Sequence, residues 1–286
     1  MSLAPEPPVV PDEPPVELRY HRHAPVLSAP SEIWRARLLI RALAEREIRA
    51  QYKQAVLGVA WAVITPVMLM LVLTIFFQRI GTIDTQGVPY SLFAYIGLVP
   101  WNFFSGSTTS GGLSLVSQMS LVNKLNCPRE VFPLSSIVVV GCNSTIASLV
   151  LLLLFAINGF MPKATTPLAV FPFVLQLIFT IAVTLLVSCT TVYLRDLRHA
   201  LPILLQLGFF ATPIAYGLDA IAPEYRVLYS ALNPMGPIID SYRRTVLYGT
   251  APDWGLLGVA SVTTAILLVG GLKLFRRLEM GFADVA

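Results

Sequence analysis

Residues 54–77 read QAVLGVAWAVITPVMLMLVLTIFF, a run of 24 positions without a charged side chain. At about 1.5 Å of rise per residue, a helix of this length can cross the ~30 Å hydrocarbon core of a bilayer, even with Pro66 inside it. The whole chain has 286 residues, of which 13% are charged and 55% hydrophobic, and its mean hydropathy is +0.70. Because a soluble domain carries about 25% charged residues, the sequence predicts a protein that crosses the membrane several times.

Further uncharged windows follow along the chain and predict an all-α membrane protein with six transmembrane helices. The six windows are residues 54–77, 91–117, 131–162, 164–194, 200–216 and 254–272. The second half of the window at 91–117 is rich in Gly, Ser and Thr, which indicates close packing against protein. With a cytoplasmic N-terminus, this arrangement puts 15 Lys and Arg residues on the cytoplasmic side and 5 outside. The positive-inside rule therefore predicts a multi-pass protein of the cytoplasmic (inner) membrane with both termini in the cytoplasm.

The N-terminal part of the chain precedes these windows and has two different compositions. Residues 1–30 contain eight prolines, and we expect them to be disordered in the cytoplasm. Residues 31–53 contain neither Pro nor Gly, and their apolar side chains fall on one half of a helical wheel while Arg and Lys fall on the other. This pattern predicts an amphipathic helix at the membrane interface, followed by a transmembrane domain at 54–286.

The segment at 217–252, between the fifth and sixth predicted spans, is too long for a turn and too short to cross the membrane twice. Two amphipathic stretches, at 223–232 and 237–248, flank the helix-breaking sequence NPMGP. We expect a re-entrant pair of short helices in the outer leaflet. Asp240, Arg243 and Arg244 fall on one face, where they form either a salt bridge within the helix or an outer gate that contacts an anionic substrate.

Several motifs are missing from the sequence, and their absence narrows the function. No GxxxxGK[ST], GxSxG or HExxH motif occurs, so we expect no ATP hydrolysis, no catalytic site, no cofactor site and no metal site on this chain. The centres of five of the predicted spans hold no ionisable side chain except cysteine, which disfavours a carrier coupled to protons or sodium. The basic residues lie at the edges of the apolar windows and form no continuous face, so a nucleic-acid partner is not expected.

The sequence resembles the membrane subunits of type-2 ABC exporters of polysaccharides, which include O-antigen, capsule and teichoic acid permeases. Residues 44–61, AEREIRAQYKQAVLGVAW, are similar to the family's basic helix end, although Gln51 stands where the family often has Arg. Cys127 similarly replaces an aromatic residue. Other similar stretches are PWNFF at 100–104, GGLSL at 111–115, NKLNCPREVFPL at 123–134, YLRDLR at 193–198, TPIAY at 212–216, NP at 233–234, Phe275, Glu279 and FADV at 282–285.

This resemblance implies a homodimer bound to two copies of a separate ABC ATPase, which would hold ATP and Mg. It implies that the cargo is a lipid-linked polysaccharide on a polyprenyl diphosphate, such as O-antigen, which passes through a channel between the two membrane subunits. Export of a drug or glycolipid is an alternative within transport. A membrane-embedded glycan transferase is a more distant alternative, for which Asp196, Asp240 and Glu130 are the candidate catalytic groups.

Three sets of residues are candidates for roles in such an exporter. Aromatic side chains that could stack on sugars in the channel, or form a belt at the membrane interface, are Phe76, Phe77, Phe209, Phe210 and Tyr216. Basic side chains that could bind the lipid diphosphate, or only anchor the helix at headgroups, are Arg46, Arg49 and Lys53. Residues that could couple the chain to the ATPase, or form only a solvated turn, are Lys124, Pro128, Arg129 and Glu130.

Overall fold

The computed structural model describes residues 29–53, 60–80, 85–122, 124–125, 127–279 and 282 of the chain. All regular structure in these ranges is helical, as the sequence predicts. The expected disorder of residues 1–30 concerns a segment that lies outside these ranges, apart from its last two residues, and so does the start of the first predicted span at 54–59.

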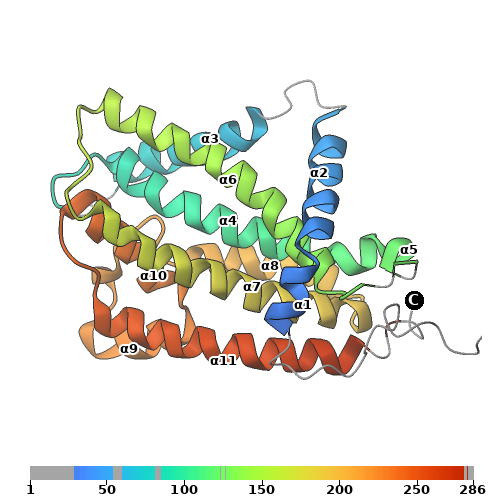
Figure 1. Ribbon diagram of the computed structural model, residues 1–286. Coiled ribbons are helices and arrows are strands. Elements are labelled where there is room, and N and C mark those ends of the chain that lie inside the picture. Colours follow the sequence, from blue (N-terminus) through green and yellow to red (C-terminus); the bar gives the residue numbers. More distant parts are fainter. Residues whose placement is uncertain are drawn as a thin grey trace, which may run out of the picture.

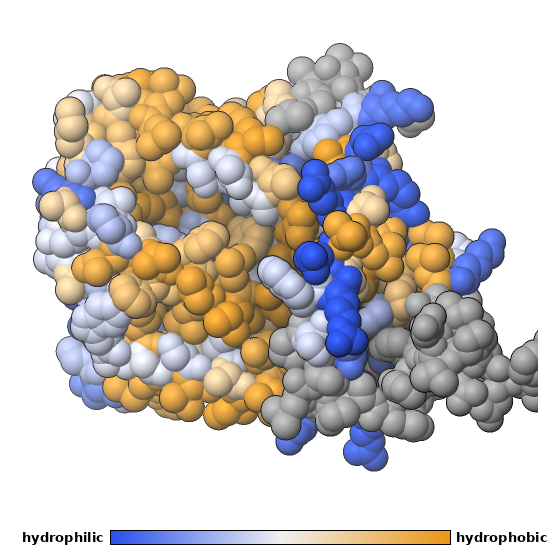
Figure 2. All heavy atoms as spheres, in the orientation of Figure 1, coloured by the Kyte–Doolittle hydropathy of each residue, from blue (hydrophilic) through white to orange (hydrophobic). Residues whose placement is uncertain are grey.

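Four of the described helices are long and apolar enough to cross a membrane, which confirms the prediction of a helical membrane protein. They are α3 (Ala60–Ile80), α6 (Val131–Ile157), α7 (Val170–Tyr193) and α11 (Trp254–Glu279). Figure 1 shows α6, α7 and α11 running along the length of the molecule, with α3 tilted the other way beside α6. On the face drawn in Figure 2, most of this region is covered by apolar side chains, as expected of a surface in contact with lipid.

A fifth long helix, α4 (Tyr90–Ser117), lies at the centre of the bundle and contacts α3, α6 and α7. Its small residues allow these neighbours to come close. A Cβ atom added at Gly112 would lie 2.6 Å from Val187 Cγ1 of α7, and one added at Gly111 would lie closer still to Thr184. The small residues of the window at 91–117 therefore face protein, as expected.

The fifth predicted span, at 200–216, is a shorter helix in the structure. α8 (Leu197–Ala211) has 15 residues, which is about 22 Å at 1.5 Å per residue and less than the hydrocarbon core requires. The chain leaves the helix at Thr212, whose backbone is extended, because the residue before a proline disfavours helical geometry. The number of six spans, which needs both α4 and α8 in addition to the four apolar helices, therefore remains a prediction.

The amphipathic segment at 31–53 forms two helices, α1 (Ala29–Arg35) and α2 (Arg37–Lys53). At the break between them, Arg37 Nη1 donates a hydrogen bond of 3.0 Å to the carbonyl of Trp34, which satisfies one of the free carbonyls at the end of α1. Figures 1 and 2 show α2 standing across the end of the bundle and carrying a dense group of hydrophilic side chains. We call this end of the bundle the α2 end.

The segment at 217–252 forms the opposite end, which we call the α10 end. It contains α9 (Pro223–Leu232) and α10 (Met235–Arg243), and α10 continues through a π-helical turn to Tyr248. The apolar residues of α10 pack on protein and not on lipid, because Ile238 and Ile239 are fully buried beside α4 and α7. α9 instead exposes its apolar side chains to the surroundings.

Candidate functional site

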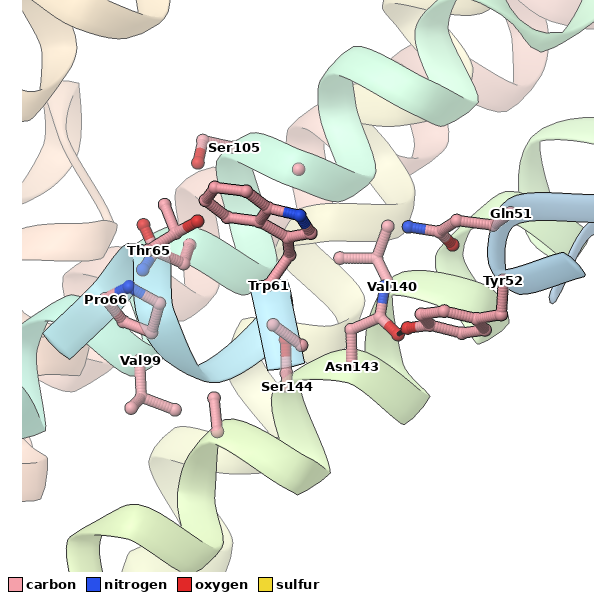
Figure 3. Close-up of a pocket in the computed structure, with 14 residues that line it drawn as sticks. Gln51, Tyr52, Trp61, Thr65, Pro66, Val99, Ser105, Val140, Asn143 and Ser144 are labelled. Carbon is pink, nitrogen blue, oxygen red and sulfur yellow. Dashed lines mark hydrogen bonds between the residues drawn. The ribbon is translucent and has the colours of Figure 1, made fainter. Parts of the chain in front are cut away.

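A polar cleft of about 400 Å³ lies where the end of α2 meets the start of α3 and the middle of α4 and α6. Figure 3 shows the Trp61 ring near its centre, with Gln51 and Tyr52 of α2 on one side and Thr65 of α3 on the other. We call it the α3 cleft. The described residues that line it are Gln51, Tyr52, Trp61, Ala62, Thr65, Pro66, Val99, Asn102, Ser105, Gly106, Val140, Asn143, Ser144 and Ala147.

The polar side chains of the α3 cleft make few bonds to protein. The Tyr52 hydroxyl donates a short hydrogen bond to Asn143 Oδ1, which links α2 to α6. The Asn102 side chain has no hydrogen-bond partner among the described residues, and neither has the hydroxyl of Ser105 or of Ser144. Polar groups in the middle of membrane helices are costly without a partner, so the cleft is suited to hold water or a polar ligand.

A second cleft, of about 440 Å³, lies on the other side of α3, between α3, α4 and α8. Asn102 and Ser105 line this cleft as well, so one polar stripe of α4 forms part of the wall of both. We call it the α8 cleft. Phe209 and Phe210, predicted as channel residues, line it, and the Phe209 ring packs edge-on against Trp101 with ring centroids 6.1 Å apart.

The other three aromatic candidates are not among the residues that line the α8 cleft. Phe77 packs against Tyr90 with ring centroids 5.9 Å apart, and Phe76 beside it is exposed. The Tyr216 hydroxyl lies 3.2 Å from the carbonyl oxygens of Phe210 and Ala211, where it donates to the last turn of α8. Tyr216 therefore lies next to the last turn of α8, which carries Phe209 and Phe210. Phe76 and Phe77 lie apart from them, at the end of α3.

None of the residues that line the α3 cleft is among the site residues predicted from the sequence. Asn102 and Asn143 are amide side chains inside apolar windows, where polar residues are rare and face cavities or other helices. That signal would have identified both residues. Trp61 was noted only as part of the resemblance, because its position relative to α6 depends on the packing of α3.

The three basic candidates lie on the last two turns of α2, next to the α3 cleft. Arg46 Nη2 donates to Gln118 Oε1 at 2.6 Å, and Arg49 Nη2 lies 3.4 Å from Glu45 Oε2. Lys53 is exposed and directly follows Tyr52 of the cleft. Of these three, Arg49 and Lys53 are the nearest in sequence to Gln51 and Tyr52, the α2 residues that line the cleft.

The four coupling candidates lie at the α2 end, but they differ in exposure. Lys124 is exposed and Pro128 is partly exposed. Arg129 donates through Nη1 to the carbonyl oxygen of Glu279 at 2.9 Å, and its Nε lies 3.9 Å from Glu279 Oε1. Glu130 is only 1% exposed, so in this conformation it contacts its own chain and not the surface of a partner.

Arg276 of α11 connects Glu130 to the N-terminal helix. Its Nε lies 3.4 Å from Glu130 Oε1, and its Nη2 donates to Glu32 Oε2 of α1 at 3.1 Å. Burial raises the pKa of the Glu130 carboxyl, an effect that the nearby Arg276 guanidinium opposes. These contacts tie together three segments that are distant in sequence: α1, the connection before α6 and the end of α11.

The predicted outer-gate residues separate into an ion pair and a buried arginine. Arg244 Nε donates to Asp240 Oδ2 at 2.6 Å, which is the salt bridge that the spacing predicts. Arg243 is 1% exposed and lies 3.6 Å above the ring of Phe93. Burial lowers the pKa of Arg243 to about 10, so the guanidinium stays charged at neutral pH.

The Arg243 guanidinium is held by backbone carbonyl groups. Nη1 donates to the carbonyl oxygens of Pro213 and Tyr216, at 2.7 and 2.9 Å, and Nη2 donates to that of Ile214 at 2.6 Å. Its Nε donates to the carbonyl oxygen of Phe93 at 3.3 Å. Arg243 therefore fixes the irregular backbone after α8 against α4 and, in this conformation, is not accessible to a substrate.

A metal site is not evident in the described part of the chain, where no three His, Cys, Asp or Glu side chains come together in a suitable group. Its three cysteines, Cys127, Cys142 and Cys189, are free thiols.

Comparison with known proteins gives the family of the chain. Residues 38–247 match the family described as ABC-2 type transporter. The chain is 33% identical over 257 residues to the O-antigen export system permease protein RfbA of Myxococcus xanthus, covering 88% of this chain and 97% of the relative. It is 26% identical over 249 residues to a protein of the same name from Klebsiella pneumoniae, covering 86% and 94%. It is 24% identical over 251 residues to the polysialic acid transport protein KpsM of Escherichia coli, covering 85% and 94%. This multi-pass membrane chain therefore belongs to the ABC-2 type transporter family of membrane subunits.

Proposed function

We propose that the chain is the permease subunit of an ATP-driven ABC exporter that moves a lipid-linked polysaccharide across the cytoplasmic membrane. The observation that supports this most strongly is its similarity, over at least 85% of its length, to proteins named for O-antigen export and polysialic acid transport. O-antigen on a polyprenyl diphosphate is our first choice of cargo, because the relative that is 33% identical carries that name. Capsule, teichoic acid, glycolipid and drug are the alternatives.

The proposed assembly is a homodimer of this chain with two copies of an ABC ATPase, which binds ATP and Mg, while this chain binds no cofactor. Two helices support an interface with a second copy. α3 and α8 flank the α8 cleft, and both expose large apolar side chains, including Ile75, Ile203 and Phe210. Facing copies of this surface would close the α8 cleft into a channel with aromatic walls, suited to stacking on sugar rings.

The α2 end is the proposed cytoplasmic side, since it carries the basic residues of α2 and the predicted positive-inside orientation requires them there. Arg46, Arg49 and Lys53 would attract the diphosphate of the lipid carrier to this side. The glycan would then pass along α3 toward the α10 end, where Asp240 and Arg244 flank the exit. Arg243 would act by holding the backbone of that exit in place.

Coupling to the ATPase is proposed to occur in two steps. The exposed Lys124 would contact the ATPase, and the connection that follows it would move. Arg129 and Glu130 would pass this movement to α11 and α1 through Glu279 and Arg276, because ion pairs of low exposure hold these segments together. Pro128 stiffens the segment between Lys124 and Arg129.

The proposal is tested by deleting the gene in its native host and measuring both the surface polysaccharide and the lipid-linked precursor inside the cell. We expect the surface polymer to disappear and the precursor to accumulate, and we expect a plasmid copy of the gene to reverse both effects. Unchanged surface polysaccharide in the deletion strain would contradict the proposed cargo.

A further inference from the structure

We infer that the α3 cleft is a binding subsite for a neutral sugar unit of the cargo, next to the diphosphate and on the cytoplasmic side of the channel. This inference rests on the proposed function and adds to it a site within a single chain, separate from the channel between the two copies. Three features of the cleft support it, namely the chemistry of its lining, its position and its connection to the α8 cleft.

The chemistry of the lining matches a sugar ring. No charged side chain is among the described lining residues, whereas amides, hydroxyls and aromatic rings are all present. A sugar offers hydroxyl groups to amides such as Asn102 and an apolar C–H face to a ring such as that of Trp61. Figure 3 shows Gln51, Asn143 and the Trp61 ring around one space, with the ring between the residues of α2 and those of α3.

Two other parts of the cargo fit this lining less well. A diphosphate needs cations, and the arginines and the lysine of α2 lie outside the cleft. A polyprenyl chain would press against amide and hydroxyl groups that have no partner among the described residues, which costs free energy for each group. The volume of about 400 Å³ lies within the range of about 300–1,000 Å³ that is usual for sites of small ligands.

The position of the cleft fits the order of groups in a lipid-linked glycan. Gln51 and Tyr52 line the cleft, and Lys53 is the next residue of α2. A diphosphate held by Arg49 or Lys53 would therefore place its attached sugar at the opening of the cleft. Because Asn102 and Ser105 also line the α8 cleft, a sugar that leaves the α3 cleft meets the same polar stripe of α4 on the other side.

The test uses accessibility of a cysteine in the cleft, in the complete transporter with its ATPase. Ala62 lines the cleft and is not one of the proposed sugar contacts, so Ala62→Cys is the reporter, with Cys127, Cys142 and Cys189 replaced by alanine. The matched control is Ala265→Cys in the same background, an exposed position that lines a largely apolar groove between α7 and α11 and shares no lining residue with the α3 cleft. Both variants are used after they restore export in the deletion strain, which tests the proposed function separately from the subsite.

Membranes are prepared from cells that make the lipid-linked glycan and from cells blocked at its first sugar, which contain only polyprenyl phosphate. We expect the glycan to slow maleimide labelling of the Ala62→Cys variant by about fivefold, the value for a site occupied about four-fifths of the time. Labelling of the Ala265→Cys control should not change. Adding Asn143→Leu, which removes the amide at similar volume, should abolish the protection at Ala62→Cys.

Two results would overturn the inference. Equal labelling of Ala62→Cys in the two kinds of membrane would mean that the glycan adds no occupant to the cleft beyond the lipid carrier. Equal protection of the Ala265→Cys control would mean that the glycan changes the whole conformation and does not bind at this cleft.

Discussion

Replacement of Arg243 by alanine should destabilise the chain strongly, although its hydrogen-bond partners among the described residues are all backbone carbonyl groups. The change removes three hydrogen bonds of 2.6–2.9 Å and leaves the carbonyl groups of residues 213, 214 and 216 without their donor. Hydrogen bonds from a charged donor contribute about 1.5–3 kcal/mol each, and the desolvation of the arginine offsets part of that. We therefore expect a loss of about 4 kcal/mol, which is large for a single substitution.

Arg244 is the matched control, because it is the next residue and also an arginine. It forms a single pair with Asp240, which is 8% exposed, so Arg244→Ala should cost about 2 kcal/mol, mostly because the buried carboxylate loses its partner. Arg243→Lys should fall between the two, since an ammonium group cannot reach the same set of carbonyls or stack on the Phe93 ring as a guanidinium does.

The measurement is the thermal midpoint of the purified detergent-solubilised complex. A loss of about 4 kcal/mol corresponds to a fall of about 10 °C in the midpoint of a chain of this size, and 2 kcal/mol to about 5 °C. A fall in Arg243→Ala no larger than that in Arg244→Ala would refute the structural role given to Arg243.

Three further predictions concern other parts of the chain. Gly97→Ala should cost about 2 kcal/mol, because its Cβ atom would lie 2.9 Å from Arg243 Nη2. Gly258→Ala should be neutral or slightly stabilising, because its Cβ atom would have no neighbour within 4 Å among the described residues. The thermal midpoints of the two variants check both values. Arg276→Ala should destabilise the chain by about 3 kcal/mol, because Glu130 loses its partner, and it should also reduce the change in ATP turnover that this chain causes in the ATPase. Arg277 is exposed, so Arg277→Ala should have neither effect. Joint charge reversal in α2 should reduce polysaccharide export without reducing the amount of inserted protein, and undiminished export would exclude capture of the diphosphate by the three residues Arg46, Arg49 and Lys53.

Much of the helical architecture follows from the sequence, because uncharged windows and amphipathic patterns depend only on local composition. The predicted windows at 131–162, 164–194 and 254–272 contain α6, α7 and most of α11. The end of α8 at Ala211 also has a local cause, because Pro213 disfavours a helical conformation at Thr212. The predicted span at 200–216 did not take this proline into account. The burial of α10 depended on tertiary packing against α4, which no periodicity specifies.

The candidate site was less predictable than the fold. Exposure of the coupling residues depends on where α11 ends, and Glu130 is buried because Arg276 approaches it from the other end of the sequence. The buried position of Arg243 likewise depends on the irregular backbone after α8. The α3 cleft forms between helices that are adjacent only in the folded chain, although the amides of Asn102 and Asn143 were visible as exceptions in apolar windows.

The central claim is that this chain exports its cargo with energy from a separate ATPase. The most direct measurement is co-purification with the ATPase encoded nearest to it, followed by ATP turnover with and without this chain. We expect a stable complex of two copies of each chain, whose ATP turnover changes when this chain is present and responds to the lipid-linked glycan. A chain that purifies without any ATPase, or an ATPase whose turnover is the same with and without it, would contradict the account.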